Sequence, residues 1–313
     1  MRVAVIPLLA ALALAPAAQQ APVNIPQQLG YPADARLLII HADDLGMSHA
    51  VNRATFEALE HNWITSSSIL VPCPWFPEVA QFARAHPDAD LGIHLAINSE
   101  WTTFRWGPIA GRTAVPSLVD DQGYLAIDEN AAVAHAKPAD VERELRAQID
   151  FARAAGINLS HLDSHMATLF HTPELFAVYR RMGQAYGLPV LLERGGERGG
   201  SESAWGTQAI GDALLDRIVS IAPGVPADQW LSAYEQLLAP LPRGGVYQLI
   251  VHLAYGDEEM HGATADHPDW GVAWRQQDFD LVKSQAFQDF LKAQGFTLIT
   301  WRQLGKLKPH SAD

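Results

Sequence analysis

Apolar and polar positions alternate in short blocks along most of the chain. Runs of about four to eight apolar residues have the length of buried strands, and the stretches between them repeat apolar residues every three or four positions, as amphipathic helices do. Strands are predicted in this way at residues 37–40, 66–71, 91–95, 157–162, 188–192, 246–253 and 296–300. Helices are predicted directly after Ser48 and at residues 76–85, 140–155, 173–186, 210–221, 228–238 and 278–294.

This alternation of strands and helices predicts an α/β fold with mainly parallel strands. About seven such units without an obvious linker favour a single domain, an irregular or incomplete (β/α) barrel. An open doubly wound sheet is the alternative that the same pattern allows. The barrel domain is expected at residues 35–307, between a flexible lead-in at 19–34 and a C-terminal tail at 308–313.

The first residues have the layout of a secretory signal peptide. Arg2 precedes an apolar run at residues 3–14, and small residues at 15–18 provide a cleavage site. We therefore expect a signal peptide at residues 1–18 and an exported, periplasmic or secreted protein. The apolar run is too short to span a bilayer comfortably, and no other stretch is long and apolar enough, so no stable membrane span is expected.

Composition narrows the classes of function. The 313 residues carry a formal net charge of -13 with only 22 lysines and arginines, and no basic run exists, so nucleic-acid binding is not expected. The single cysteine, Cys73, cannot form an internal disulfide, and a buried thiol is favoured over a nucleophile.

Side chains typical of metal sites follow the predicted strands. They are Asp43 and Asp44 after the first strand, His94 on the third, His161, Asp163 and His165 after the fourth, and His252 on the sixth. Strand ends of a barrel meet at one face, so these side chains are expected to converge. One carboxylate and two imidazoles form a common ligand set for a divalent ion, zinc or magnesium, that activates water, and a second carboxylate can take the proton of that water. Each residue alone is more typical of a satisfied core histidine or a helix cap.

Three segments together resemble the signatures of a known family. Residues 41–46 (HADDLG), 91–95 (LGIHL) and 161–165 (HLDSH) are similar to those of the YdjC-like carbohydrate deacetylases, which include chitooligosaccharide deacetylases. Residues 64–68 (ITSSS) match the family as well, and the resemblance extends from about residue 36 to residue 304. It implies an irregular barrel, one divalent metal ion and a carbohydrate substrate.

The resemblance also implies roles for individual residues. Asp44, His94 and His165 would hold the metal, and Asp43 would be the general base for metal-activated water. His252 would protonate the leaving amine, orient the substrate or bind the oxyanion. His161 and Asp163 would orient the ligand His165.

The sequence departs from the family at three places. His41 stands where the family usually has Asn, Leu45 stands where it has Phe, and residues 166–171 replace further histidines with MATLFH. Because the proposed ligands and base are all present, the departures bear on sugar specificity more than on hydrolysis.

The stretch at residues 98–137 is long and irregular, as functional loops often are. Its Trp101, Arg105 and Trp106 are candidates for substrate binding, because aromatic faces stack on sugar rings. Packing of the same residues against the top of the barrel is an equal alternative.

The function expected from these features is that of an exported, metal-dependent hydrolase that removes acetyl groups from N-acetylated sugars. A metal-dependent amide or ester hydrolase with a non-sugar substrate and a noncatalytic carbohydrate-binding protein are the alternatives. A metal-free glycosidase is disfavoured because it gives the histidines no role.

Overall fold

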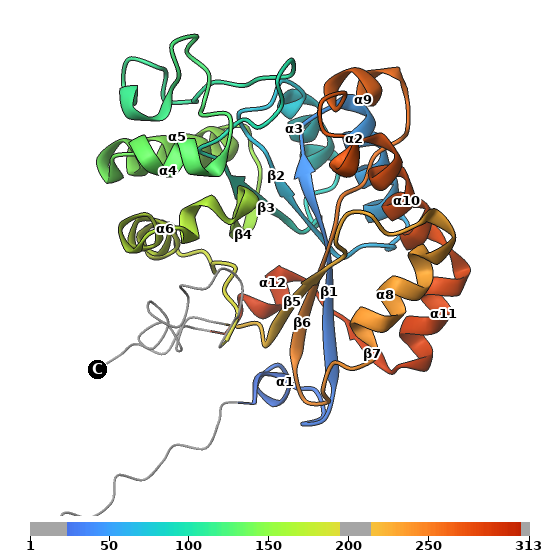
Figure 1. Cartoon of the computed structure of the whole chain (residues 1–313). Helices are drawn as coiled ribbons and strands as arrows, with labels where there is room; N and C mark the ends of the chain where they lie inside the picture. The colour runs from blue at the N-terminus through green and yellow to red at the C-terminus, as the bar shows by residue number, and fades with distance from the viewer. Residues whose placement is uncertain (1–23, 195–213, 308–313) are drawn as a thin grey trace, which may run out of the picture.

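A computed structural model describes residues 24–194 and 214–307 of the chain (Figure 1). The expected signal peptide at 1–18, the first part of the lead-in and the tail at 308–313 lie outside the described residues. Within the described ranges, no helix is both long and apolar enough to cross a bilayer.

The fold is built on a parallel seven-stranded sheet. Its strands are β1 (Arg36–Leu45), β2 (Ser66–Ile69), β3 (Leu91–Leu95), β4 (Leu159–Ser164), β5 (Arg217–Ser220), β6 (Val246–Val251) and β7 (Phe296–Leu298). The order is β4-β3-β2-β1-β6-β5, and β7 pairs with the first residues of β1 while β2 pairs with its last ones. Every pairing is parallel, which confirms the predicted α/β fold with mainly parallel strands.

The sheet curves into a barrel that stays incomplete. No ladder joins its edge strands among the described residues, but two single bridges lie between them, Leu162 with Val190 and Glu193 with Leu215. Trp301 crosses the interior, because its ring stacks on His161 of β4 and its Nε1 donates a hydrogen bond to Gln248 of β6. One side chain therefore contacts strands from opposite halves of the sheet, as expected for an irregular barrel rather than a flat open sheet.

Helices surround the sheet in Figure 1, with the short α12 near its centre. They are α1 (Ile25–Gln28), α2 (His49–Glu60), α3 (Phe76–Ala85), α4 (Glu129–His135), α5 (Pro138–Ala154), α6 (Pro173–Tyr186), α8 (Trp230–Leu238), α9 (Glu258–Ala263), α10 (Val272–Lys283), α11 (Gln285–Ala293) and α12 (Trp301–Leu304). Short 3-10 turns occur at Pro116–Leu118, His165–Phe170, Ala227–Gln229 and Pro268–Trp270. Ser48 caps α2 as predicted, since its Oγ accepts a hydrogen bond from the backbone N–H of Val51.

The structure corrects three predicted elements. The helix expected at 210–221 is wrong for its described part, where β5 pairs with β6 and Ile218 and Val219 suit a strand. The strand expected at 188–192 contributes only a single bridge, at Val190. The helix expected at 278–294 is two helices, because extended backbone at Ser284 ends α10 and its Oγ caps α11.

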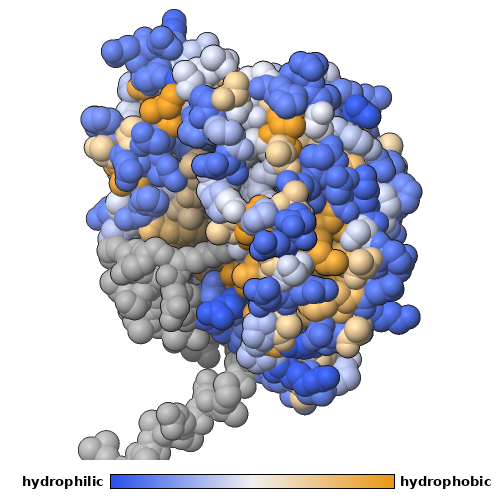
Figure 2. Space-filling model, turned by 45° about the vertical axis from the view of Figure 1, so that its right-hand side comes forward, coloured by the Kyte–Doolittle hydropathy of each residue, from blue (hydrophilic) through white to orange (hydrophobic). Residues whose placement is uncertain are grey.

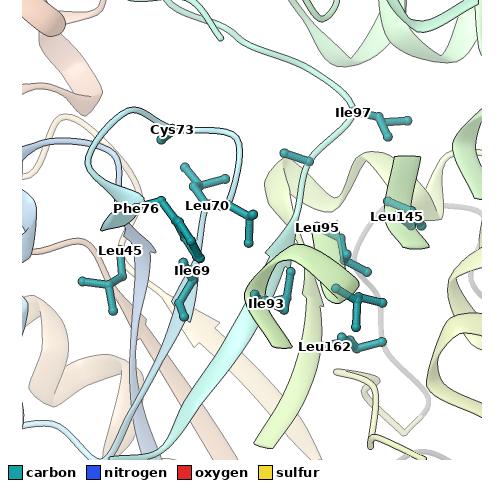
Figure 3. Close-up of a cluster of buried hydrophobic side chains, with 14 of the residues drawn as sticks. Leu45, Ile69, Leu70, Cys73, Phe76, Ile93, Leu95, Ile97, Leu145 and Leu162 are labelled. Carbon is teal, nitrogen blue, oxygen red and sulfur yellow. The ribbon is translucent and has the colours of Figure 1, made fainter. Parts of the chain in front are cut away.

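Apolar side chains fill the space between strands and helices. Figure 3 shows one cluster, in which Leu45, Ile69 and Ile93 of neighbouring strands pack with Phe76 of α3. Each such buried side chain contributes about 1.5–3 kcal/mol relative to an exposed one. On the face shown in Figure 2, hydrophilic residues predominate and apolar residues form small groups among them.

One glycine is required for the interior to close. A Cβ at Gly92 of β3 would lie 2.3 Å from the ring of His161, closer than real contacts allow. The ring of His161 thus fits between β3 and Trp301 of α12. With α12 in the interior, the C-terminal ends of the strands remain as the place where polar side chains meet.

Candidate metal centre

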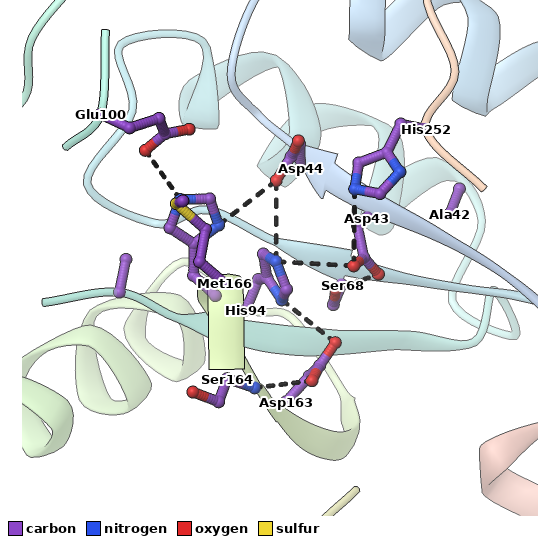
Figure 4. A network of polar contacts seen from close by, with 12 residues as sticks. Ala42, Asp43, Asp44, Ser68, His94, Glu100, Asp163, Ser164, Met166 and His252 are labelled. Carbon is purple, nitrogen blue, oxygen red and sulfur yellow. Dashed lines mark hydrogen bonds and ion pairs between the residues drawn. The ribbon is translucent and has the colours of Figure 1, made fainter. Parts of the chain in front are cut away.

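The structure brings the side chains at the strand ends together (Figure 4). Asp43 and Asp44 lie at the end of β1, His94 lies near the end of β3, and His165 directly follows β4. The Oδ1 atom of Asp44 lies 3.6 Å from Nε2 of His94 and 3.5 Å from Nδ1 of His165. These ligand atoms all lie within 4.8 Å of one another, so the three residues expected to hold a metal can share one ion.

The donor atoms of this group fit a divalent ion. All three side chains are buried, yet Asp44 Oδ1 and His165 Nδ1 form no hydrogen bond with any residue that the structure describes. Buried polar atoms are nearly always hydrogen-bonded, so atoms left without partners indicate room for another group. Two imidazoles and one carboxylate are the donors of many zinc sites that retain an open position.

Local backbone geometry lets two consecutive carboxylates reach the same place. Successive strand residues normally point to opposite faces of a sheet. Asp44 has a positive φ of 67°, which is uncommon for a residue other than glycine, and the pairing of β1 with β2 shifts register between Ala42 and Leu45. As a result Asp43 Oδ2 also lies near His94 Nε2, at 3.7 Å.

Each imidazole ligand has a carboxylate at its other nitrogen. His94 Nδ1 lies 3.1 Å from Asp163 Oδ2, and His165 Nε2 lies 2.9 Å from Glu100 Oε2. Such carboxylates fix the orientation and tautomer of metal-binding histidines. Asp163 therefore lies against His94 rather than His165, and Glu100 occupies the place that the sequence analysis gave to Asp163.

His161 also lies elsewhere than expected. Its ring stacks on Trp301 at a centroid distance of 4.9 Å and meets the ring of His41 edge-on at 5.0 Å. Among the described residues, its ring therefore contacts His41 and Trp301 rather than His165. Its place is in the barrel interior, behind the ligand group.

Asp43 is held among several polar side chains. Its Oδ1 lies 3.2 Å from His41 Nε2, and Ser68 Oγ donates a long hydrogen bond to it at 3.5 Å. Its Oδ2 lies 3.8 Å from His252 Nε2. The carboxylate thus lies between the candidate metal ligands and His252.

His252 follows β6 and is fixed by α10. Its ring lies 4.7 Å from that of Trp274, and its backbone N–H donates a hydrogen bond of 2.9 Å to Asp278. Burial lowers the pKa of His252 to about 4, although the carboxylates of Asp44 and Asp43 oppose this. The imidazole is therefore neutral near pH 7 in the absence of an ion, so it can accept a proton or donate its N–H hydrogen bond.

Neighbouring charges shift the pKa values of Asp44 and His165 in opposite directions. Burial opposes ionisation of Asp44, but the guanidinium of Arg275 and the imidazole of His165 hold its pKa well below the usual value. Burial likewise opposes a charge on His165, but the carboxylates of Glu100 and Asp44 raise its pKa to about 10. A proton must leave this imidazole before its Nδ1 can bind an ion, so binding is coupled to proton release.

Sequence reasoning missed the contribution of α10. Arg275 Nη2 lies 2.7 Å from Asp44 Oδ2, and Asp278 holds the backbone of His252. The sequence predicts a helix only from residue 278, so Arg275 lies outside the predicted helix, whereas α10 begins at Val272. Residues spaced three apart on one helix face share a direction, but nothing in the sequence shows what that face meets.

The aromatic residues of the long loop pack against the fold. Trp101 and Trp106 are only 2% and 3% exposed, and Trp106 Nε1 donates a hydrogen bond to the Asn98 carbonyl. Arg105 is paired with Asp120 at 3.0 Å. In this structure the three candidate substrate-binding residues therefore pack against the fold, which is the alternative interpretation of the sequence.

Comparison with known proteins agrees with the motifs. The sequence profile of the YdjC-like protein family matches residues 37–293. A carbohydrate deacetylase of Geobacillus stearothermophilus is 34% identical over 87% of this chain and 99% of the relative, and one of Thermus thermophilus is 32% identical over 85% and 93%.

A solved structure shares the fold. The crystal structure of a candidate cellobiose-phosphate cleavage protein from Enterococcus faecalis V583 superposes with a TM-score of 0.73 over 86% of this chain and 99% of that chain. Its sequence identity of 22% supports the likeness of fold alone. From the profile match and the two relatives together, the chain belongs to the YdjC-like protein family.

Proposed function

We propose that this protein is a metal-dependent hydrolase that removes acetyl groups from N-acetylated sugars. The observation that carries the proposal is the buried group of Asp44, His94 and His165 with Asp43 beside it. The names of its relatives, carbohydrate deacetylases, supply the substrate class. The histidine-rich donor set favours an ion of the zinc type, while magnesium prefers oxygen ligands.

Different residues of the site would have different roles in amide hydrolysis. A divalent ion held by Asp44, His94 and His165 would lower the pKa of a coordinated water and polarise the acetyl carbonyl. Asp43, which lies beside His94 and His41 and accepts a long hydrogen bond from Ser68, would accept the proton of the attacking water. Asp163 and Glu100 keep the two imidazoles oriented.

His252 lies near Oδ2 of Asp43, whereas His41 lies near Oδ1, and His252 is our candidate for protonating the leaving amine. Its neutral imidazole can receive a proton during the reaction and pass it to the departing amine, or donate its N–H to the developing oxyanion. Its 3.8 Å distance from Asp43 Oδ2 allows both residues to face the same bond.

The test combines metal analysis with a substrate panel. Purified protein is assayed for bound metal and for amine release from acetylated chitooligosaccharides, acetylated monosaccharides and simple acetamides or esters. Asp44→Ala is expected to lose both the metal and the amine release, while Asp269→Asn, a change at an exposed carboxylate, keeps both. Full amine release by metal-stripped protein would reject the proposal.

The panel also separates the alternatives. Because Trp101 and Trp106 are buried, they offer no exposed face for sugar stacking, and a non-sugar amide or ester stays a defined alternative. Turnover of simple acetamides but not of sugars would identify that activity. Tight sugar binding without amine release by metal-loaded protein would identify a noncatalytic binding protein.

We also propose that the protein is exported, on the basis of the signal-peptide pattern at residues 1–18. N-terminal sequencing of the mature protein from a bacterial host should begin after about residue 18, and an intact Met1 in the exported fraction would contradict cleavage.

A further inference from the structure

We propose that Arg275 is a positioning residue that restricts Asp44 to a single ligand oxygen. The inference rests on the proposed function, because it concerns the ion held by Asp44, His94 and His165. It adds a role for a residue of α10 that lies outside the proposed ligand set.

The two oxygens of Asp44 have different partners. Oδ2 accepts a hydrogen bond of 2.7 Å from Arg275 Nη2, within a fully buried ion pair. Oδ1 faces the opposite way, toward His94 Nε2 and His165 Nδ1, and has no hydrogen bond among the described residues. The carboxylate is thus turned so that one oxygen is occupied and one remains for an ion.

Arg275 is itself held rigidly. It is 3% exposed, its Nε donates a hydrogen bond of 3.1 Å to the Trp270 carbonyl, and its guanidinium lies 5.9 Å above the ring of Trp101. A planar guanidinium in fixed contacts keeps its partner in one orientation better than a flexible ammonium does. The loop at residues 98–137 and the turn at Pro268–Trp270 therefore both help to fix the position of Arg275.

Carboxylates bind divalent ions through one oxygen or through both. Without Arg275, Oδ2 of Asp44 would be free to bind the ion as well, and it would take a position that water or the acetyl oxygen needs. Loss of the nearby cation also makes the ligand group more negative, which favours the ion. We therefore expect removal of the guanidinium to separate metal affinity from turnover.

The experiment uses the full chain with Arg275→Met and Arg275→Lys. Metal affinity is measured by competition with a chromophoric chelator, in the absence of substrate, and the visible absorption of the cobalt-loaded protein reports the number of ligands. For Arg275→Met we expect affinity within about threefold of wild type or tighter, weaker cobalt absorption, and amine release reduced at least about tenfold.

Arg275→Lys retains a cation but cannot hold both Asp44 and the Trp270 carbonyl, so an intermediate cobalt spectrum is expected. The matched control is Arg243→Met, which removes a cation whose side chain is 67% exposed and which pairs, among the described residues, with Asp34. It should match wild type in every measurement. Thermal unfolding in the presence of chelator shows that each variant is folded, and Arg275→Lys carries the test if Arg275→Met does not fold.

Two results would overturn the role of Arg275. One is a wild-type cobalt spectrum in both variants, and the other is a loss of metal affinity that parallels the loss of amine release in folded protein. Failure of the proposed function gives a different result, because wild type itself would then bind no metal or release no amine.

Discussion

Glu100 Oε2 lies 2.9 Å from Nε2 of His165, a residue 65 positions further along the chain. The carboxylate comes from the long loop after β3, whereas the corresponding partner of His94, Asp163, lies within β4. One imidazole of the candidate metal centre is therefore oriented by the barrel and the other by a loop. The order of this loop and the affinity for an ion should be coupled.

Replacement of Glu100 by Ala should weaken metal binding about 10- to 100-fold, because His165 loses the acceptor that orients it. Glu100→Gln retains an acceptor oxygen without the charge and should have a smaller effect. Competition titration with a chelator measures both. Asp121→Asn, at an exposed position of the same loop, is the control, and an equal loss of affinity there would point to loop order rather than to the contact.

Replacement of His41 should affect turnover more than metal binding. His41 Nε2 lies 3.2 Å from Asp43 Oδ1 and 3.8 Å from Asp163 Oδ2, but it contacts none of the three ligands. His41→Ala should lower kcat about tenfold or more while KM and metal affinity stay near wild type, because the general base loses its orientation. His41→Asn, which keeps a polar side chain beside Asp43, should lose less. A parallel loss of metal affinity would contradict this division.

The ligand group could be predicted because its residues lie at strand ends. Parallel strands bring their C-terminal ends to one rim, so the strand pattern predicts that Asp44, His94 and His165 lie near one another, while the family resemblance selects them as metal ligands. Glu100 and Arg275 have no such signal. The partner of a loop carboxylate depends on the path of the loop, and the partner of a helix residue depends on how the helix packs.

The corrected elements have a similar cause. At residues 217–220 local spacing favoured a helix, but pairing with β6 decides the conformation, since strand preference depends strongly on tertiary context. Asp163 was correctly placed near the ligands but assigned to the wrong imidazole. Which of two neighbouring histidines a carboxylate contacts depends on side-chain positions to within about one ångström. Residue types alone do not encode positions so finely.

The long loop is anchored to α5 by a buried carboxylate. Glu144 accepts hydrogen bonds of 2.9 Å from the backbone N–H groups of Ile109 and Ala110. Glu144→Gln can accept only one of them, so it should lower the free energy of unfolding by about 1–3 kcal/mol in urea titrations. Glu142→Gln, on the same helix, weakens two partly exposed pairs, with Arg146 and with Arg181, and should cost about 0.5 kcal/mol or less. Equal effects of the two changes would contradict the anchoring role.

Asp278 links His252 to two helices. Its Oδ2 accepts the backbone N–H of His252, and its Oδ1 accepts Nε1 of Trp230 and the hydroxyl of Tyr234. These three donors favour the ionised form, but burial outweighs them and raises the pKa of Asp278 to about 7. The carboxyl of Asp278 therefore changes its protonation near neutral pH in the folded protein.

Stability should fall as the pH rises through neutrality because of Asp278. Between about pH 4 and 7, Asp278 holds a proton in the folded protein that it has released in the unfolded chain. The contribution of this proton to the free energy of unfolding is therefore complete below about pH 4 and lost above about pH 7. From about pH 5.5 to about pH 8, it should lower the free energy of unfolding by about 2 kcal/mol in wild type. Asp278→Asn should lack this decrement, although its amide meets the His252 N–H poorly and destabilises the protein at the lower pH. Urea titrations of both proteins at the two pH values, with chelator present throughout, measure how far the pH dependence of the free energy of unfolding differs between them. The same pH dependence in Asp278→Asn would assign the loss of stability to other groups.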